Sequence, residues 1–292
     1  MHIVCACDEK YVPHTATMLC SVLSHTKTVE AIHLIHNGIQ HSVLARLTKF
    51  VKGFGIGIED YMIDESQLED LVVSGHASSA NYFRLLIPEV LPDYVDKVLY
   101  LDSDIVALDS LDEIWEIDIS RCLLAAAENP GFTEYSRLSI PVEYKYFNSG
   151  VMLINVALWR QQKTHLAVIG YIKQNPDRIT YWDQDGFNAL LYDKWIELSL
   201  CWNAQHNLFL EENLRIQYKH VVDKPFILHY SGDGLKPWQY NSPHPLKQKY
   251  FEYRKKTPWK KISIEGTPNI HIRIRNKIKS VNRLFSKNNS DT

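Results

Sequence analysis

The chain has 292 residues, of which 45% are hydrophobic and 23% are charged. This composition is that of a globular protein with a large core, and it excludes a disordered or collagen-like chain. The 32 lysines and arginines nearly balance the 34 aspartates and glutamates, so the chain as a whole has no positive field with which to hold nucleic acid.

Strands alternate with helices in the first part of the chain. The hydrophobic pattern predicts strands at residues 1–7, 31–36 and 55–62, and helices at residues 13–26 and 42–51. Such alternation favours a parallel sheet that is covered by helices on both faces.

The pattern continues through the middle of the chain. It predicts strands at residues 97–101, 123–127 and 150–155, and helices at residues 79–86, 166–174 and 184–191. The strand at 97–101 runs directly into Asp102-Ser103-Asp104. Ligands of open α/β sheets collect at the carboxyl ends of strands, so these acids stand where a site is expected.

The cysteines and the apolar segments indicate a cellular compartment. Five cysteines are few, odd in number and mostly in apolar surroundings, which suits free thiols in a reducing cytoplasm. The apolar start of the chain reaches Asp8 and is too short for a signal peptide. No apolar run approaches the length of a membrane span. We therefore expect a cytoplasmic protein.

Asp102 and Asp104 are candidate ligands of a hard divalent cation. Side chains two residues apart in an extended chain point the same way, and Mg²⁺ and Mn²⁺ prefer oxygen ligands. Acids are also common in solvated turns after strands, so the pair alone is a weak signal.

A second segment, FILHYSGDGLKPW at residues 226–238, strengthens the signal. An apolar strand delivers His229, a glycine-rich loop that can approach a ligand closely follows, and Lys236 offers a point charge suited to phosphate. Histidine as a third metal ligand and lysine as a phosphate clamp would fit one site.

Four segments in a fixed order carry a family resemblance: YLDSDIVALDSLDEIW, YFNSGVMLIN, YWDQDGFNALL and HYSGDGLKPW. Together they resemble the signature segments of glycosyltransferase family eight, which includes glycogenin and the bacterial lipooligosaccharide galactosyltransferases. The resemblance runs from Met1 to about Trp238. It implies a single Rossmann-like domain of the GT-A type with a mixed central sheet. It also implies metal-dependent, retaining transfer of a hexose, glucose or galactose, from a UDP-sugar to a saccharide.

The resemblance also assigns roles to residues. The nucleotide would lie on Ala6, Asp8 and Tyr11. The metal, Mn²⁺ or Mg²⁺, would be held by Asp102, Asp104 and His229, with Ser103 as a further contact of the donor. Arg84, Gly232 and Lys236 would reach the diphosphate. The donor sugar would lie along Asn148, Ser149, Gly150 and Asp183, with Gln184 beside the anomeric carbon. The loop after His229 is one residue longer than the usual pattern, so Gly232 and Gly234 both remain candidates for the glycine under the pyrophosphate.

Several mechanisms and functions remain open. Because the amide of Gln184 is a poor nucleophile, we favour front-face transfer; the rival is double displacement through Asp185 or Asp183. The segment around Asp102 also resembles the first motif of haloacid-dehalogenase-type phosphotransferases, in which that aspartate would attack phosphate. A third alternative is a non-catalytic module that binds a sugar nucleotide or a glycan.

The end of the chain has a different composition. Residues 272–287 hold six lysines and arginines and no acid, in the pattern of a basic interfacial helix. We expect a catalytic domain at residues 1–250 and a basic segment at 251–292. That segment would rest on the anionic inner face of a membrane, or else be a solvated terminus. Membrane contact would favour a glycolipid or oligosaccharide acceptor in lipopolysaccharide or other cell-surface glycan synthesis.

Overall fold

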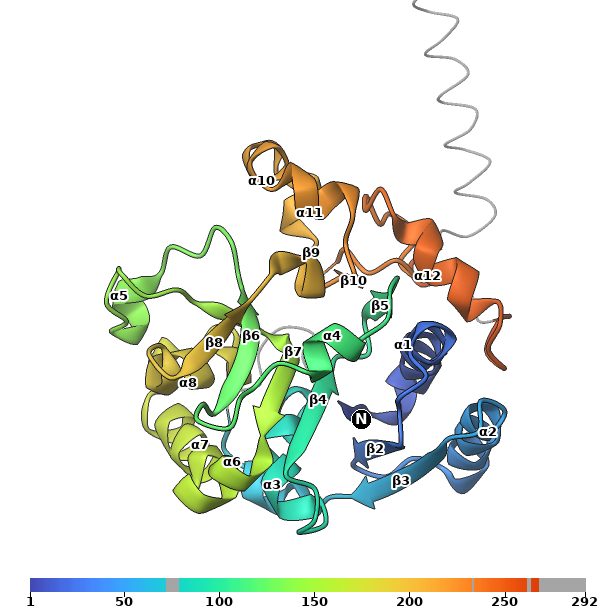
Figure 1. The fold of residues 1–292 in the computed structure, drawn as a ribbon, viewed down its shortest axis with the longest axis horizontal. Helices are drawn as coiled ribbons and strands as arrows, with labels where there is room; N and C mark the ends of the chain where they lie inside the picture. Colours follow the sequence, from blue (N-terminus) through green and yellow to red (C-terminus); the bar gives the residue numbers. More distant parts are fainter. Residues whose placement is uncertain (72–78, 233, 262–263, 268–292) are drawn as a thin grey trace, which may run out of the picture.

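The structure is a computed structural model, and it describes residues 1–71, 79–232, 234–261 and 264–267. Over these residues the main sheet has seven strands (Figure 1). Their order is β3 (Gly57–Met62), β2 (Ala31–His36), β1 (His2–Ala6), β4 (Lys97–Leu101), β7 (Phe147–Asn155), β6 (Leu124–Glu128) and β8 (Trp195–Leu198). β4 is the middle strand, so the acids that follow it lie at the centre of one edge of the sheet.

The direction of the strands brings two predicted motifs together. β3, β2, β1 and β4 run parallel, whereas β7 runs antiparallel to both of its neighbours, β4 and β6. The sheet is therefore mixed, which confirms the predicted fold class. Because β7 opposes β4, the residue after β4 lies beside the first half of β7, and the Asp102 N–H donates to the Gly150 carbonyl at 2.8 Å.

Helices cover both faces of the sheet. Alternate residues of a strand face opposite sides, and in β4 Leu99 and Leu101 pack into one core while Val98 and Tyr100 pack into another. The first core is closed by α1 (Val12–His25) and α2 (His41–Lys52). The second is closed by η3 (Ser79–Leu86), α6 (Val156–Gln162), α7 (Thr164–Gln174) and α8 (Trp182–Leu191).

A small second sheet lies next to the end of β4 (Figure 1). In the described part of the chain it consists of β5 (Ile105–Ala107), β10 (Ile227–His229) and β9 (Ala204–Gln205). β5 pairs antiparallel and β9 parallel with β10, so His229 lies opposite Ile105 on one side and Gln205 on the other. The strand before His229 was predicted, but β5 and β9 were not.

The remaining elements are short, apart from α12 (Lys247–Arg254). They are η1 (Glu9–Tyr11), η2 (Glu65–Leu68), α3 (Ile87–Val90), α4 (Asp112–Trp115), α5 (Tyr135–Leu138), η4 (Pro176–Arg178), η5 (Leu200–Asn203), α9 (Asn207–Leu210), α10 (Glu212–Gln217) and α11 (Lys219–Asp223). α12 packs on α1, where His14 Nδ1 lies 2.7 Å from the Tyr250 hydroxyl. Because α12 spans residue 250 and ends at Arg254, we propose that any boundary before the tail falls after Arg254. The predicted basic helix at 272–287 lies outside the described residues.

The predicted strands and long helices are present, with ends that differ by up to three residues. The segment at 79–86 is helical, but it is the 3₁₀ helix η3 rather than an α-helix. Cys5, Cys7 and Cys20 are buried free thiols, as predicted, and burial raises the pKa of Cys7 to about 12. None of the helices in the described ranges combines the length and apolarity that a bilayer crossing needs.

Candidate active site

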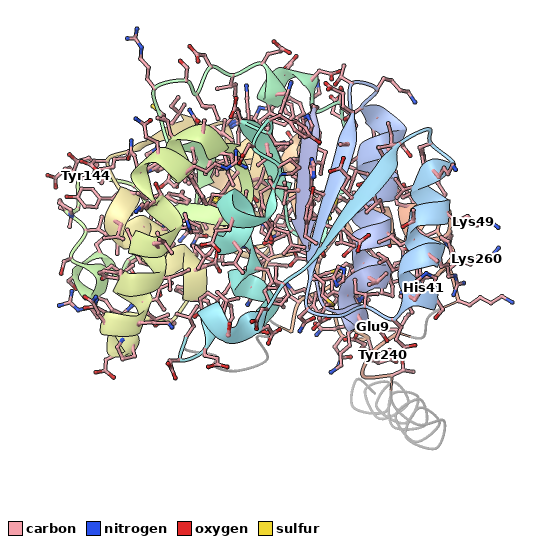
Figure 2. All side chains as sticks on the ribbon, turned by 90° about the horizontal axis from the view of Figure 1, so that it is seen from below. Glu9, His41, Lys49, Tyr144, Tyr240 and Lys260 are labelled. Carbon is pink, nitrogen blue, oxygen red and sulfur yellow. The ribbon has the colours of Figure 1, made fainter. Side chains whose placement is uncertain are left out.

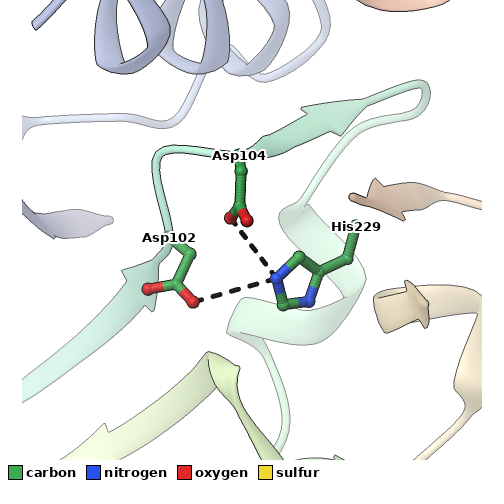
Figure 3. Close-up of side chains that lie close together, drawn as sticks. All are labelled: Asp102, Asp104 and His229. Carbon is green, nitrogen blue, oxygen red and sulfur yellow. Dashed lines mark ion pairs between the residues drawn. The ribbon is translucent and has the colours of Figure 1, made fainter. Parts of the chain in front are cut away.

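Two acids and a histidine meet at the end of β4 (Figure 3). His229 Nε2 lies 3.3 Å from Asp104 Oδ1 and 3.8 Å from Asp102 Oδ2. One ligand atom from each of the three residues lies within 4.8 Å of the others. Two carboxylates and an imidazole turned toward one point form a donor set that fits a divalent cation, so the predicted metal ligands are brought together.

The two sheets set this geometry. Asp102 follows β4, and Asp104 precedes β5, whose pairing with β10 places His229 opposite Ile105. The Tyr230 N–H also donates to the Asp104 carbonyl at 3.0 Å. Residues 125 positions apart in the chain, Asp104 and His229, are therefore held by backbone pairing rather than by their side chains alone.

Arg84 connects Asp102, Asp104 and His229, the metal triad, to the predicted sugar-binding residues. From η3 its guanidinium reaches Asp102 Oδ1 at 2.9 Å and Asp183 Oδ2 at 3.2 Å, and it donates to the Ser149 carbonyl at 2.7 Å. Its Cζ lies 4.5 Å from the centre of the Tyr100 ring. Burial raises the pKa of Asp183 to about 6, although the Arg84 charge opposes this shift. The positive charge of Arg84 is therefore shared between the negative charges of two carboxylates, Asp102 and Asp183.

Lys236 comes to Asp104 from the loop after β10. Its ammonium contacts Asp104 and donates to the Tyr230 carbonyl at 2.8 Å. Burial opposes ionisation of Asp104, but the Lys236 charge outweighs it and holds the pKa of Asp104 well below its usual value. The predicted phosphate clamp thus lies at the metal triad.

The two glycines of this loop differ in their surroundings. A Cβ on Gly232 would lie 2.5 Å from Leu235 Cδ1 and 2.9 Å from His206 Nε2. Gly234 has a φ of +69°, a left-handed conformation that side chains with a Cβ rarely adopt. Gly232 is therefore the closely packed glycine, and Gly234 is the one whose backbone conformation favours glycine.

The predicted sugar strip at residues 148–150 lies against α8. Asn188 fixes the two elements together, because its Oδ1 accepts from the Phe147 N–H at 2.7 Å and its Nδ2 donates to the Phe147 carbonyl at 2.9 Å. Ser149 Oγ donates to Asp183 Oδ2 at 3.1 Å. Asp183 and Gln184 of α8 therefore lie beside the strip, and all of these side chains are buried.

Asp185 anchors the start of α8. Its carboxylate, which is fully buried, accepts from Arg137 at 2.8 Å and from the N–H groups of Thr180 and Tyr181, each at 2.7 Å. Trp182, the first residue of α8, has a φ of +48°, which is an outlier for a bulky side chain. Asp185 thus holds a strained turn immediately before Asp183 and Gln184.

The predicted nucleotide residues lie at the next strand end. Asp8 accepts from the Tyr11 N–H at 3.0 Å and so caps η1, while the Tyr11 ring meets the Trp238 ring edge-on at 6.0 Å. Ser103 contacts Thr15 Oγ1 at 2.8 Å and donates weakly to the Ala6 carbonyl at 3.5 Å. The first βα turn and the loop after β10 therefore share one edge of the molecule, where Figure 2 labels Glu9 and Tyr240.

Several residues of the site were not predicted, among them Tyr100, Arg137, Tyr146 and Asn203. The hydroxyl of Tyr100 donates to Asp102 Oδ1 at 2.8 Å, and the side chain of Asn203 lies 2.8 Å from His229. Tyr100 lies in β4, Arg137 in α5, Asn203 in η5 and Tyr146 just before β7, and none of them belongs to a local sequence pattern. Only the contacts in the folded chain reveal them.

Buried histidines predict how stability depends on pH. Burial lowers the pKa of His14 to about 3 and the pKa of His33, His206 and His244 to about 4, from an ordinary value of 6.5. The unfolded chain takes up these protons below pH 6.5, whereas the folded chain does not. The free energy of unfolding should therefore fall as the pH drops from about 6.5 toward 4, by about 1.4 kcal/mol per pH unit for each proton.

Urea unfolding at a series of pH values measures this slope. His244 packs between the rings of Phe209 and Tyr230, each with a centroid distance of 4.8 Å, so His244→Phe should keep the packing. That variant should have a slope smaller by one proton over the same range. An equal slope in the two proteins would show that His244 is not held neutral.

Comparison with known proteins assigns the chain to a family. The model of Glycosyl transferase family 8 matches residues 2–242. General stress protein A of Bacillus subtilis (strain 168) is 35% identical over 283 residues, which are 93% of this chain and 98% of that protein. Lipopolysaccharide 1,3-galactosyltransferase of Salmonella typhimurium (strain LT2) is 28% identical over 263 residues, with 86% of this chain and 77% of that protein covered.

A solved structure supports the same fold. The galactosyltransferase LgtC, in complex with donor and acceptor sugar analogs, superposes with a TM-score of 0.79 at 23% sequence identity. The match covers 94% of this chain and 99% of that chain. This chain therefore shares its fold with a galactosyltransferase, and its sequence matches the family model over most of its length. The chain belongs to glycosyltransferase family 8.

Proposed function

We propose that this glycosyltransferase moves a hexose, glucose or galactose, from a UDP-sugar to a saccharide acceptor and retains the configuration at the anomeric carbon. The observation that carries the proposal is the metal triad, with Arg84 and Lys236 on it and the buried strip beside it. A diphosphate needs cations, and a sugar needs oriented polar groups. The metal triad with Arg84 and Lys236 meets the first requirement, and the adjacent buried strip meets the second.

Asp102, Asp104 and His229 are the ligands we propose for Mn²⁺ or Mg²⁺. Carboxylate oxygens suit both ions, and the imidazole favours a transition metal such as Mn²⁺. Once bound, the ion would supply a Lewis acid for the charge that develops on the diphosphate.

Arg84 and Lys236 would act on the same charge. As the bond between the anomeric carbon and UDP breaks, negative charge grows on the departing phosphate oxygen. Both cations are already oriented by hydrogen bonds to backbone carbonyls, Arg84 to Ser149 and Lys236 to Tyr230. Fixed charges of this kind stabilise a transition state without reorganisation at the moment of reaction.

The surroundings of the two α8 carboxylates favour front-face transfer. In this mechanism the acceptor hydroxyl attacks on the side from which UDP leaves, and its proton goes to the departing phosphate oxygen. A double displacement would instead need a free carboxylate. Asp185 is fully buried and its oxygens accept from Arg137 and two backbone N–H groups, and Asp183 is paired with Arg84. Trapping a glycosylated carboxylate by mass spectrometry would overturn the front-face proposal.

The acceptor is proposed from the relatives. The Salmonella relative named above is a lipopolysaccharide galactosyltransferase, and a further relative in Escherichia coli (strain K12) is named lipopolysaccharide glucosyltransferase WaaO. We propose an oligosaccharide or glycolipid acceptor of cell-surface glycan synthesis on the cytoplasmic side of the membrane. Contact of residues 251–292 with anionic lipid stays a prediction from charge.

Release of UDP tests the donor and the metal before any acceptor is known. Purified protein is incubated with UDP-glucose, UDP-galactose and other UDP-sugars, with and without Mn²⁺, and free UDP is measured. We expect one UDP-hexose to be hydrolysed well above the others, and only with a divalent cation. UDP release without any need for a cation would contradict the metal proposal.

The same assay addresses the alternatives. Family 8 membership replaces the phosphotransferase interpretation, in which Asp102 would attack phosphorus. In the structure Asp102 Oδ1 is instead engaged by Arg84 and the Tyr100 hydroxyl. A non-catalytic module would bind a UDP-sugar without releasing UDP under any condition, and that outcome would favour the third alternative.

A further inference from the structure

A chain of buried amides connects the metal triad to α8. His229 Nδ1 lies 2.8 Å from Asn203 Oδ1, and Asn203 Nδ2 donates to Asn148 Oδ1 at 2.9 Å. Asn148 Nδ2 then donates to Gln184 Oε1 at 2.9 Å. All four side chains are at most 9% exposed. Water therefore does not compete for these hydrogen bonds, and each amide must face one particular way.

Two backbone groups fix how the amides face. The Gly150 N–H lies 3.0 Å from Asn148 Oδ1, and the Ser149 N–H lies 3.1 Å from Gln184 Oε1. A backbone N–H only donates, so the atoms that face these groups are the amide oxygens. The NH₂ group of Asn148 is then the end that faces Gln184.

The orientation of Asn203 follows from that of Asn148. Because Asn148 presents its oxygen, Asn203 must turn its NH₂ group toward it and its own oxygen toward His229. An amide oxygen only accepts, so His229 Nδ1 carries the proton. In the neutral imidazole Nε2, which lies 3.3 Å from Asp104 Oδ1, is then the nitrogen whose lone pair is available to a metal.

The hydrogen bonds beyond Gln184 agree with this orientation of the amides. Gln184 Nε2 donates to the Tyr146 hydroxyl at 3.1 Å, and that hydroxyl donates to Asp185 Oδ1 at 2.8 Å. The Asp185 carboxylate also accepts from Arg137 and from two backbone N–H groups, so it serves as the terminal acceptor. Each hydrogen bond from His229 to Asp185 thus joins one donor to one acceptor.

We infer that Asn203 is a positioning residue that holds His229 as the Nδ1–H tautomer and presents Nε2 to the metal. An acceptor on the far nitrogen orients a metal-binding imidazole and raises its basicity, and loss of such a partner typically weakens metal binding about 10- to 100-fold. The tautomer stands independently of the reaction. The metal-binding consequence rests on the function proposed above.

The tautomer is measured first, on the full chain without metal. Nitrogen-15 NMR of histidine-labelled protein at alkaline pH distinguishes the two neutral tautomers, and a His229→Gln variant identifies the His229 signal. Wild-type protein should give the Nδ1–H pattern, and Asn203→Leu should lose it. A wild-type Nε2–H pattern would overturn the inference.

Binding of Mn²⁺ in the presence of UDP, followed by electron paramagnetic resonance of the free ion, is the second measurement. Asn203→Leu should bind Mn²⁺ about 10- to 100-fold more weakly. Asn203→Asp, whose carboxylate still accepts from His229 but cannot donate to Asn148, should stay within about threefold of wild type for Mn²⁺ while losing turnover. Unchanged Mn²⁺ affinity in Asn203→Leu would overturn the positioning role.

A matched control separates positioning from packing. Asn207 is also buried, at 9% exposure, and donates to the Pro130 carbonyl at 2.7 Å outside this chain of amides. Asn207→Leu should lower the melting temperature without changing Mn²⁺ affinity. If wild-type protein releases UDP from no UDP-hexose but shows the Nδ1–H tautomer, the proposed function fails while the structural inference stands.

Discussion

Asp102→Asn is expected to abolish the stimulation of UDP release by Mn²⁺ and to lower kcat/KM at least about 100-fold, since removing a direct ligand should cost more than removing the partner of a ligand. The substitution keeps the size of the side chain but removes its charge. Oδ2 of Asp102 lies 3.8 Å from His229 Nε2, so the ion would lose one of two carboxylates. The assay is UDP release over a range of Mn²⁺ concentrations.

The same substitution also weakens a buried ion pair, and the controls must account for this. Arg84 would face a neutral amide in place of the Asp102 carboxylate but keep its ion pair with Asp183. Thermal unfolding shows whether the variant stays folded. Asp109→Asn, at an exposed acid of the same segment, should leave both activity and the Mn²⁺ response unchanged. A normal Mn²⁺ response in folded Asp102→Asn would remove the metal assignment.

Local sequence patterns were sufficient to predict most elements and the acids of the site. Apolar runs of strand length and helical periodicity depend on neighbouring residues, so β4 and α1 could be predicted from the sequence. The acids after β4 were found because a strand end is a known place for ligands in this fold class. For His229 the glycine-rich loop and Lys236 after the strand supplied a second local signal.

The partners of the site residues had no local signal. Asn203 lies 55 residues from Asn148 in sequence, and its role depends on β9, a strand of only two residues. Arg137 reaches Asp185 from α5, a four-residue helix. Such contacts are set by how distant segments pack, and side-chain type alone does not reveal them. The 3₁₀ form of η3 was likewise missed, because helical periodicity over eight residues does not distinguish it from an α-helix.

The backbone of β7 passes so close to the metal triad that only glycine fits at position 150. A Cβ there would lie 2.3 Å from His229 Cε1 and 2.6 Å from Asp102 Oδ2. Both neighbours are held in place, since Asn203 lies 2.8 Å from His229 Nδ1 and Arg84 contacts Asp102 at 2.9 Å. Gly150→Ala must therefore displace His229 or Asp102, the proposed metal ligands, rather than the end of a flexible side chain.

We expect Gly150→Ala to lower UDP release at least about 100-fold and to weaken Mn²⁺ binding about as much as the loss of a ligand does. The matched control is Gly170→Ala in α7, where a Cβ would meet nothing within 4 Å. Alanine is better than glycine inside a helix by about 1 kcal/mol, so that variant should keep full activity and unfold at a slightly higher temperature. If Gly150→Ala bound Mn²⁺ as tightly as wild type, His229 and Asp102 could not both be ligands in the geometry described, because one of them must move to admit the methyl group.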